Sequence, residues 1–410
     1  MTHRSLEANR RERFAWISFP LLVLLVTVAG CERNEVGELG AQEEAETTEV
    51  ETAADAGIAL ADTASLTVAE ALAAATMPGT GDPSGAPASG PDGAVAAPAE
   101  GLVDPAEMAS AEGPAAPAAP AAPAVRYNAG EDPGYAAEMG WPVQGPTLLP
   151  GSILPENRIV CYYGNPNSTR MGALGQYPKE EMLGRLRDQI SAWERADPET
   201  PVQPCLHMVS VVAQGEAGTS GHYRSIMRDV DVQKVYDWAK EINGIFIVDI
   251  QVGTDDIRNI LPRFEWILTN PDVHLAIDPE FYMKDGSRPG RRIGTMDAAD
   301  INYASDYLAN LVREHELPPK VLIIHRFTRP MVTNYREIRL RPETQIVMHM
   351  DGWGAPWLKR DSYRDYIIRE PVQFTGFKIF YHNDTKDGAP LMQPGDLLRL
   401  HPVPAYVQYQ

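Results

Sequence analysis

The chain has 410 residues with 36 basic and 56 acidic side chains, which give a formal charge of −20 at neutral pH. A charge this negative argues against a nucleic-acid partner and against docking on anionic lipid headgroups. About 17 of the acidic residues lie between positions 32 and 125, where there is one basic residue, so the rest of the chain is close to neutral. The overall charge therefore says little about what a folded domain would recognise.

The amino terminus, residues 1–30, predicts a signal peptide. Four arginines precede an apolar run from Ile17 to Val28, which is shorter than the ~20 residues that a bilayer-spanning helix needs. The sequence Val28-Ala29-Gly30-Cys31 resembles the lipobox of bacterial lipoproteins. That resemblance implies that Cys31 becomes the first mature residue, carries lipid and anchors the exported chain to the cell membrane or outer membrane. The domain would then lie on the periplasmic or extracellular side.

Residues 31–127 predict a disordered acidic tether. They consist largely of Ala, Pro, Gly, Glu and Thr, include repeated Ala-Ala-Pro, and contain almost no aromatic side chain. Such a composition cannot bury enough apolar surface to offset the conformational entropy lost on ordering.

From Asn128 the composition changes, and residues 128–410 have the length of one large α/β domain. Short apolar runs alternate with amphipathic stretches, and the connections after the predicted strands are longer than those before them. Eight such units in series predict a (β/α)8 barrel of the TIM type. An open doubly wound sheet is the alternative. The predicted strands are 158–164, 203–213, 244–252, 273–281, 320–328, 345–352, 374–381 and 404–409, and the main predicted helices are 179–196, 231–243, 255–268, 297–315 and 357–369.

Two cysteines besides Cys31 fall on the first and second predicted strands. In an exported protein Cys161 and Cys205 could form a disulfide. Two packed free thiols are the interpretation favoured from sequence, because both residues lie in the middle of buried strands.

Ionisable residues follow the apolar part of several strands, where a barrel places its active site. Asp249 ends the third strand, and Asp278 and Glu280 end the fourth. If that strand continues through Glu280, both carboxyls point to the same side, ~6.6 Å apart along the chain. Crowded carboxylates cannot all ionise easily, so one should keep its proton near neutral pH and act as an acid. Paired carboxylates of this kind cleave glycosidic bonds, and we predict Glu280, Asp278 and Asp249 as the catalytic candidates. A purely structural role for these carboxylates is the alternative.

Other polar and aromatic residues at the same strand ends are candidates for binding substrate. Aromatic rings suit the apolar faces of sugars. The candidates are Tyr163, Gln251, His325, His349, Asp351, Trp353, Lys378 and Tyr381.

The same carboxylates, with His325 and His349, could instead hold a divalent metal in a hydrolytic site. The leading hypothesis requires neither a metal nor a cofactor. His207 and His274 are interpreted as core or rim residues.

Four motifs resemble those of a family of uncharacterised secreted bacterial proteins over about residues 159–410. They are Asp249-Ile250-Gln251, Leu275 to Glu280, His349 to Gly352 and Lys378 to Tyr381. The resemblance implies a glycoside-hydrolase-like barrel. The Asp278-x-Glu280 pair also resembles the end of the D-x-x-D-x-D-x-E strand of chitinase-like barrels, which implies Glu280 as the acid, although Ala276 stands where an Asp is expected.

Together these observations predict a tethered, glycan-active hydrolase of the cell envelope, with a polysaccharide or peptidoglycan as ligand. Two alternatives remain open, a non-catalytic envelope glycan-binding or structural lipoprotein and a metal-dependent hydrolase.

Overall fold

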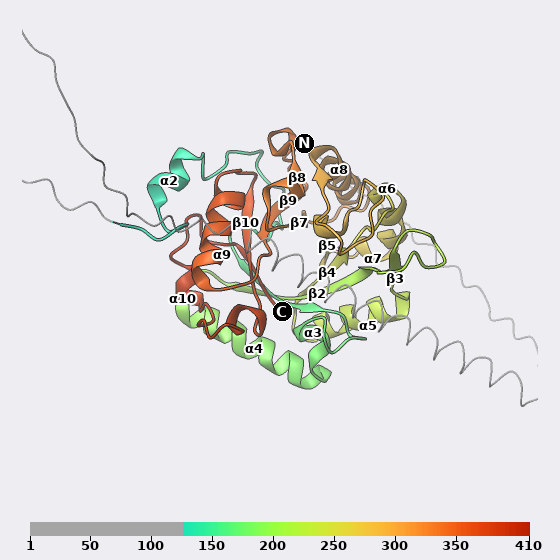
Figure 1. Ribbon diagram of the computed structural model, residues 1–410, viewed down its shortest axis with the longest axis horizontal. Helices are drawn as coiled ribbons and strands as arrows, with labels where there is room; N and C mark the ends of the chain where they lie inside the picture. Colours follow the sequence, from blue (N-terminus) through green and yellow to red (C-terminus); the bar gives the residue numbers. More distant parts are fainter. Residues whose placement is uncertain (1–125) are drawn as a thin grey trace, which may run out of the picture. The chain divides into compact units, whose positions relative to one another are not determined.

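Residues 126–410 are described in the computed structural model and form a closed barrel of eight parallel strands (Figure 1). Each strand pairs with the next in the order β1, β2, β4, β5, β7, β9, β10 and β11, and β11 pairs with β1 to close the ring. The predicted (β/α)8 architecture is therefore confirmed, and the open doubly wound sheet is wrong. The strand bounds are β1 Arg158–Gly164, β2 Val202–Ala213, β4 Ile245–Ile250, β5 Val273–Ile277, β7 Lys320–Arg326, β9 Thr344–Met350, β10 Phe374–Ile379 and β11 Tyr406–Tyr409.

Helices lie outside the ring of strands, as Figure 1 shows for α4, α5 and α8. The α-helices are α2 Pro133–Glu138, α3 Ala173–Gln176, α4 Lys179–Ala196, α5 Asp229–Lys240, α6 Ile257–Ile260, α7 Glu265–Leu268, α8 Ala298–Glu314, α9 Pro356–Ser362 and α10 Pro394–Leu397. Short 3-10 turns occupy Leu261–Phe264, Pro279–Phe281, Arg329–Met331, Tyr335–Glu337 and Asn383–Thr385, and a π-helical turn covers Tyr363–Ile368. Among residues 126–410 no helix is both long and apolar enough to cross a membrane.

Local sequence explains where the helices begin and break. Asp297 caps α8, and the Asp300 carboxylate accepts a hydrogen bond from the Asp297 backbone N–H, which completes a capping box. The predicted helix over 255–268 is divided into α6, a 3-10 turn and α7, because Pro262 lacks the N–H that a continuous helix requires there. Three short strands complete the chain: β3 Arg224–Ile226 pairs antiparallel with β2, and β6 Met296–Asp297 pairs with β8 Val332–Thr333.

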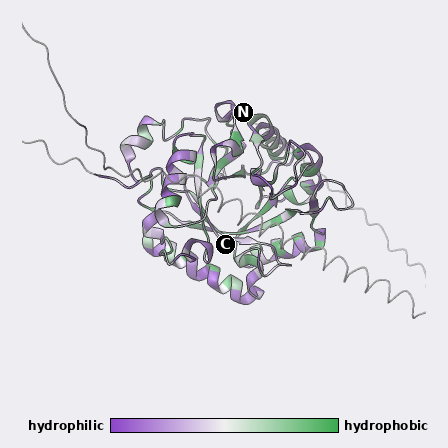
Figure 2. Cartoon of the chain, in the orientation of Figure 1, coloured by the Kyte–Doolittle hydropathy of each residue, from purple (hydrophilic) through white to green (hydrophobic). Residues whose placement is uncertain are grey.

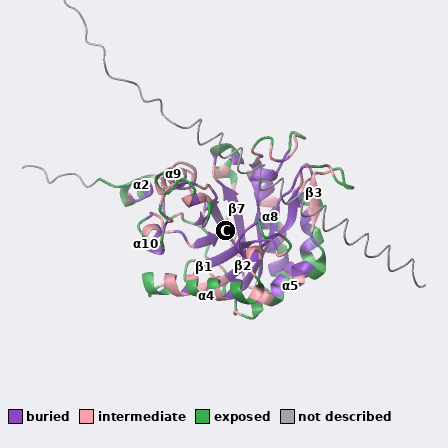
Figure 3. Ribbon diagram, turned by 60° about the horizontal axis from the view of Figure 1, so that its bottom comes forward, coloured by how far each residue is buried: buried purple, intermediate pink, exposed green. Residues whose placement is uncertain are grey.

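The apolar core has two parts, one inside the barrel and one between the strands and the helices. The helices combine hydrophilic and hydrophobic residues (Figure 2), and α4 and α5 expose part of their surface while barrel strands such as β1 and β7 are buried (Figure 3). Alternation along each strand sends one set of side chains inward and the next set outward. The interior cluster of the barrel contains Leu154, Ile159, Cys161, Cys205, Ile245, Ile247, Ala276, Val321, Ile323, Val347 and Tyr406.

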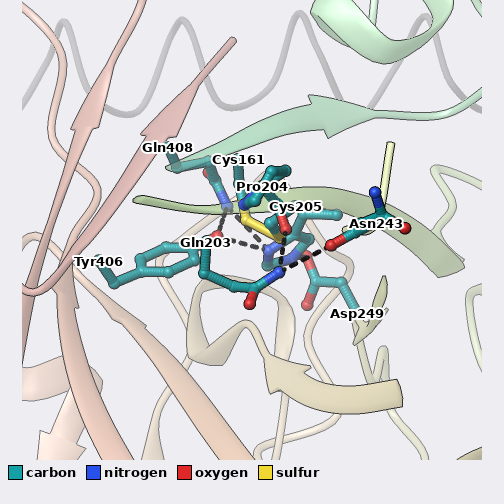
Figure 4. Close-up of a disulfide and its surroundings, with 9 residues drawn as sticks. Cys161, Gln203, Pro204, Cys205, Asn243, Asp249, Tyr406 and Gln408 are labelled. Carbon is teal, nitrogen blue, oxygen red and sulfur yellow. Dashed lines mark hydrogen bonds and ion pairs between the residues drawn. A yellow bond between two sulfur atoms is a disulfide. The ribbon is translucent and has the colours of Figure 1, made fainter. Parts of the chain in front are cut away.

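A disulfide joins Cys161 on β1 to Cys205 on β2, so the interpretation as free thiols is wrong (Figure 4). The two residues are direct partners in the β1–β2 register, and their Cα atoms are 4.3 Å apart. Both side chains point into the barrel, which sequence position alone did not establish. The bond closes a loop with a sequence separation of 44 residues.

We expect the double variant Cys161→Ala, Cys205→Ala to lower the free energy of unfolding by about 4 kcal/mol, the loop-entropy value for a closure of this length. Equilibrium urea unfolding measures the change. Adding reductant should lower the stability of the parent by a similar amount and leave the variant unaffected. A parent whose unfolding does not respond to reductant would contradict the cross-link.

The predicted signal peptide, Cys31 and all but the end of the predicted tether lie outside the described residues, so their assignments stay predictions.

Candidate active site

A layer of polar side chains occupies the barrel interior at the carboxyl ends of the strands, above the apolar interior cluster. Asp249, His325, His349 and Lys378 are each the penultimate residue of their strand, and each is at most 3% exposed. Side chains two residues apart on a strand point to the same side. Ile247, Ile323 and Val347 belong to the interior cluster, so Asp249, His325 and His349, two residues later, also point into the barrel. The structure thus brings four of the predicted site residues together.

Asp249 lies between two histidines. Its Oδ2 is 3.2 Å from His207 Nε2 and 3.6 Å from His325 Nε2, and all three side chains are fully buried. Burial alone would raise the pKa of Asp249, but the two histidines outweigh it and hold that pKa below its ordinary value. Burial lowers the pKa of His207 to about 4, even though Asp249 acts in the opposite direction.

Asp351 connects His325 to Lys378. His325 Nδ1 lies 2.7 Å from Asp351 Oδ2, and Lys378 Nζ lies 2.9 Å from Asp351 Oδ1. Burial would raise the pKa of Asp351, but Lys378 and His325 together lower it, so this carboxyl stays ionised. The pKa of His325 is raised, because Asp249 and Asp351 outweigh the effect of burial.

Asp278 and Glu280 do not form the predicted same-side pair on a strand. β5 ends at Ile277, and Asp278 caps a 3-10 turn whose first residue is Pro279. Asp278 Oδ1 accepts a hydrogen bond of 2.9 Å from the Glu280 backbone N–H. The alternation that gave the predicted 6.6 Å spacing along the chain therefore does not apply.

Asp278 is nevertheless a carboxyl whose pKa is raised. It is 3% exposed, and burial raises its pKa to about 7. His325 opposes this shift, while the charges of Asp351 and Asp249 add to it. This direction agrees with the expectation that one carboxyl would keep its proton near neutral pH, and burial is the main cause of the shift. The assignment of the catalytic acid stays a prediction.

Three residues of this layer were not recognised from sequence. The ring of His207 is 5.2 Å from that of Tyr163, and its Nδ1 lies 2.7 Å from the Tyr406 hydroxyl. Gln408 Nε2 donates to the same hydroxyl at 2.8 Å. The alternation of side chains along a strand could have indicated them. His207 follows Cys205 by two residues and Gln408 follows Tyr406 by two, so each points to the same side as an interior residue. Tyr163, which was predicted, lies in the layer with Lys378 Nζ 3.9 Å from its ring centroid.

One predicted substrate-binding residue, Tyr381, is placed outside this layer. The Tyr381 hydroxyl lies 3.1 Å from that of Tyr162 and donates to Gln189 of α4 at 3.3 Å, so it lies outside the barrel wall. Its ring stacks on Tyr409. Gln251 accepts a hydrogen bond from the Ala213 backbone and ties two strand ends together.

Trp353 lies in the loop after β9, where it is half-buried with Lys386 Nζ 3.7 Å from its ring centroid. His349 packs edge-on against the rings of His325 and Tyr406. Neither of its ring nitrogens forms a hydrogen bond to any residue in 126–410.

Two groups in this layer offer ligand atoms close enough together to hold a metal ion. One is His207, Asp249 and His325; the other is His325, His349 and Asp351. In the second group both oxygens of Asp351 already face Lys378 and His325. The first group is therefore better suited to a metal.

A separate cavity of about 540 Å³ lies at the opposite end of the barrel, where the strands begin. Arg158 is the only charged residue among those that line it, and Arg158 pairs with Asp197 at 2.9 Å. The ionisable groups suited to acid–base chemistry are at the carboxyl end instead. The chain matches no protein-family model and no curated protein.

Proposed function

We propose that the barrel is a hydrolase of glycosidic bonds whose proton donor is Asp278. The observation that carries this proposal is the burial of the Asp278 carboxyl directly after β5, which raises its pKa, and the charges of Asp351 and Asp249 add to that shift. A glycosidic acid must keep its proton near neutral pH until the leaving oxygen takes it.

We assign Asp351 as the ionised carboxylate that acts together with Asp278. It is oriented by His325 and Lys378 and is more exposed than Asp249, which is fully buried behind two histidines. Asp278 gives its proton to the glycosidic oxygen as the carbon–oxygen bond breaks. Water adds to the sugar carbon and loses a proton to Asp351, and that proton later returns to Asp278.

Sugar release from a panel of peptidoglycan and envelope polysaccharides tests this function. We expect the full chain to release reducing ends, Asp278→Asn to lower the rate at least a hundredfold, and the rate of the parent to decline above about pH 7. Asparagine keeps an oxygen that can accept the Glu280 backbone bond, so the variant should fold.

Asp132→Asn is the matched control, because Asp132 caps α2 as Asp278 caps its 3-10 turn. A Glu280→Gln variant that loses activity while Asp278→Asn retains it would show that the acid is misassigned. Binding of a glycan without release, in both parent and variants, would make the chain a recognition module instead.

We also propose that the chain is exported and anchored by lipid on Cys31, which would confine it to envelope substrates. Several acyl chains on one residue give stable attachment, since each buried CH₂ contributes about 0.8 kcal/mol. We expect the full chain expressed in bacteria to be in the membrane fraction and to incorporate labelled fatty acid, and Cys31→Ser to lose the label. A Cys31→Ser chain that keeps the label would refute the anchor.

A further inference from the structure

The facing atoms of His207, Asp249 and His325 form a buried polar centre that is poorly supplied with hydrogen bonds. Among the described residues, His325 Nε2 and Asp249 Oδ1 have no hydrogen-bond partner, and His207 Nε2 and Asp249 Oδ2 face only each other at 3.2 Å, without the geometry of a regular hydrogen bond. Leaving a buried polar atom without a partner costs about 1–3 kcal/mol each, so several such atoms facing one another require an explanation. The three residues come from β2, β4 and β7, and their ligand atoms lie within 4.8 Å of one another.

The opposite side of each imidazole is already engaged. His325 Nδ1 donates to Asp351 at 2.7 Å, so in the neutral ring, the form that binds a metal, the lone pair of His325 Nε2 faces Asp249. His207 Nδ1 lies 2.7 Å from the Tyr406 hydroxyl and 3.0 Å from Gln408 Nε2, and Nε2 faces Asp249. Binding a metal through Nε2 requires the proton on Nδ1, with the Gln408 amide turned so that its otherwise unpartnered Oε1 faces that proton. A histidine that binds a metal almost always donates its other ring N–H to a carboxylate or another acceptor.

The distances from Asp249 Oδ2 to the two histidine nitrogens fit a tetrahedral ion. Bonds of about 2.0–2.1 Å to Zn²⁺ imply separations of roughly 3.4 Å between ligand atoms. Asp249 Oδ2 lies 3.2 Å from His207 Nε2 and 3.6 Å from His325 Nε2, on either side of that value. Two imidazoles and one carboxylate favour a transition metal over Mg²⁺ or Ca²⁺, which prefer oxygen ligands.

We propose that His207, Asp249 and His325 bind a divalent transition-metal ion, of which Zn²⁺ is the best match. Asp351 orients His325, and Lys378 holds Asp351. Three protein ligands leave a coordination position for water, as in catalytic zinc sites. Only a role for that water in hydrolysis rests on the function proposed above; the binding of the ion does not.

Metal titration of the full chain tests the site without any substrate. The protein is purified without reductant, so that the Cys161–Cys205 disulfide stays intact and supplies no thiolate. After treatment with a chelator and its removal, Co²⁺ and Zn²⁺ are added separately. We expect one ion per chain, a visible absorption band for the cobalt form, and its loss when Zn²⁺ displaces cobalt.

Variants distinguish this site from other histidines. We expect His207→Gln and the nearly isosteric Asp249→Asn to weaken Zn²⁺ binding at least a hundredfold, and Asp351→Asn to weaken it 10- to 100-fold, as loss of a supporting carboxylate does. His274→Gln is the control, because His274 is also a buried histidine inside the barrel but accepts a bond from the Val321 backbone. Circular dichroism verifies that each variant is folded.

Two results would overturn the site: a folded parent that binds neither ion, or an Asp249→Asn variant with the Zn²⁺ affinity of the parent. Failure of the site and failure of the proposed function are distinguishable. Sugar release in the presence of chelator, by a chain that binds no ion, would refute the metal and leave the hydrolase. One bound ion per chain with no sugar release would refute the hydrolase and leave the metal site.

Discussion

Asp278→Asn is expected to stabilise the folded, metal-free chain by as much as about 4 kcal/mol at pH 8 and to change its stability little at pH 4 or below. The pKa of Asp278 is about 7 in the folded chain against an ordinary value of 3.8, and each pKa unit corresponds to about 1.36 kcal/mol. Between these two pKa values the folded chain holds a proton that the unfolded chain has released. The contribution of Asp278 to stability therefore falls as pH rises from about 4 to about 7.

Urea unfolding of parent and variant at the two pH values, with chelator present, measures this effect. The difference between variant and parent isolates Asp278 from other groups whose pKa shifts have the opposite sign, such as Asp249. Asp132→Asn again serves as the control for loss of a capping carboxylate. A variant no more stable than the parent at pH 8 would mean that Asp278 is not held in its neutral form.

A gain in stability together with a loss of activity would be informative. A side chain that destabilises the folded state at neutral pH and has a simple, better tolerated substitute is characteristic of functional sites. Neither a structural cap nor a surface carboxylate would give both results.

The barrel was predictable from sequence because its strands are buried on both faces. Such strands are nearly continuous apolar runs, and β1, β7 and β10 begin at the predicted residues. The ends were less predictable. Pro279 stops β5 at Ile277, and the predicted strand through Phe281 overlooked that proline, which cannot donate a ladder hydrogen bond.

The same reasoning found most members of the site that stand at strand ends, although it missed Gln408 at the end of β11, and it did not find His207, which lies within a strand. Asp249, His325, His349 and Lys378 are penultimate residues, whereas His207 is followed by six more residues of β2, up to Ala213. Its place in the layer results from the stagger of neighbouring strands, in which Met208 pairs with Val248 and Tyr163 with His207. That stagger is a property of the closed barrel, and a single strand does not contain it. The prediction for Tyr381 was wrong for a simpler reason. Tyr381 follows Ile379 by two residues, and Ile379 points outward into the core between the strands and the helices.

Lys359 and Asp384 form a second buried ion pair, just behind the site. Lys359 Nζ lies 2.8 Å from Asp384 Oδ2 and donates to the backbone oxygens of Gly352 and Lys378. Asp384 accepts from two backbone N–H groups in the loops after β9 and β10, at 2.9 and 3.0 Å. The side chains are 1% and 2% exposed. The pair therefore fixes both loops, and with them the backbone at each end of the Asp351–Lys378 ion pair.

We expect Lys359→Met to lower the free energy of unfolding by about 3–5 kcal/mol, because it leaves Asp384 charged and buried. Asp384→Asn should cost a similar amount by leaving Lys359 unpaired. The double variant Lys359→Met, Asp384→Asn should cost much less than the sum, since neither charge is then buried alone. A double-mutant cycle by urea unfolding measures this coupling, and additive single effects would contradict it.

Activity should not follow stability in this cycle. The double variant removes the buried charges but also removes the ammonium that joins the backbones of Gly352 and Lys378. We therefore expect it to regain most of the lost stability while sugar release stays well below that of the parent. If its activity returned together with its stability, the pair would only support the fold. A lasting defect would identify Lys359 as a positioning residue that acts on the substrate site through Lys378 and Asp351.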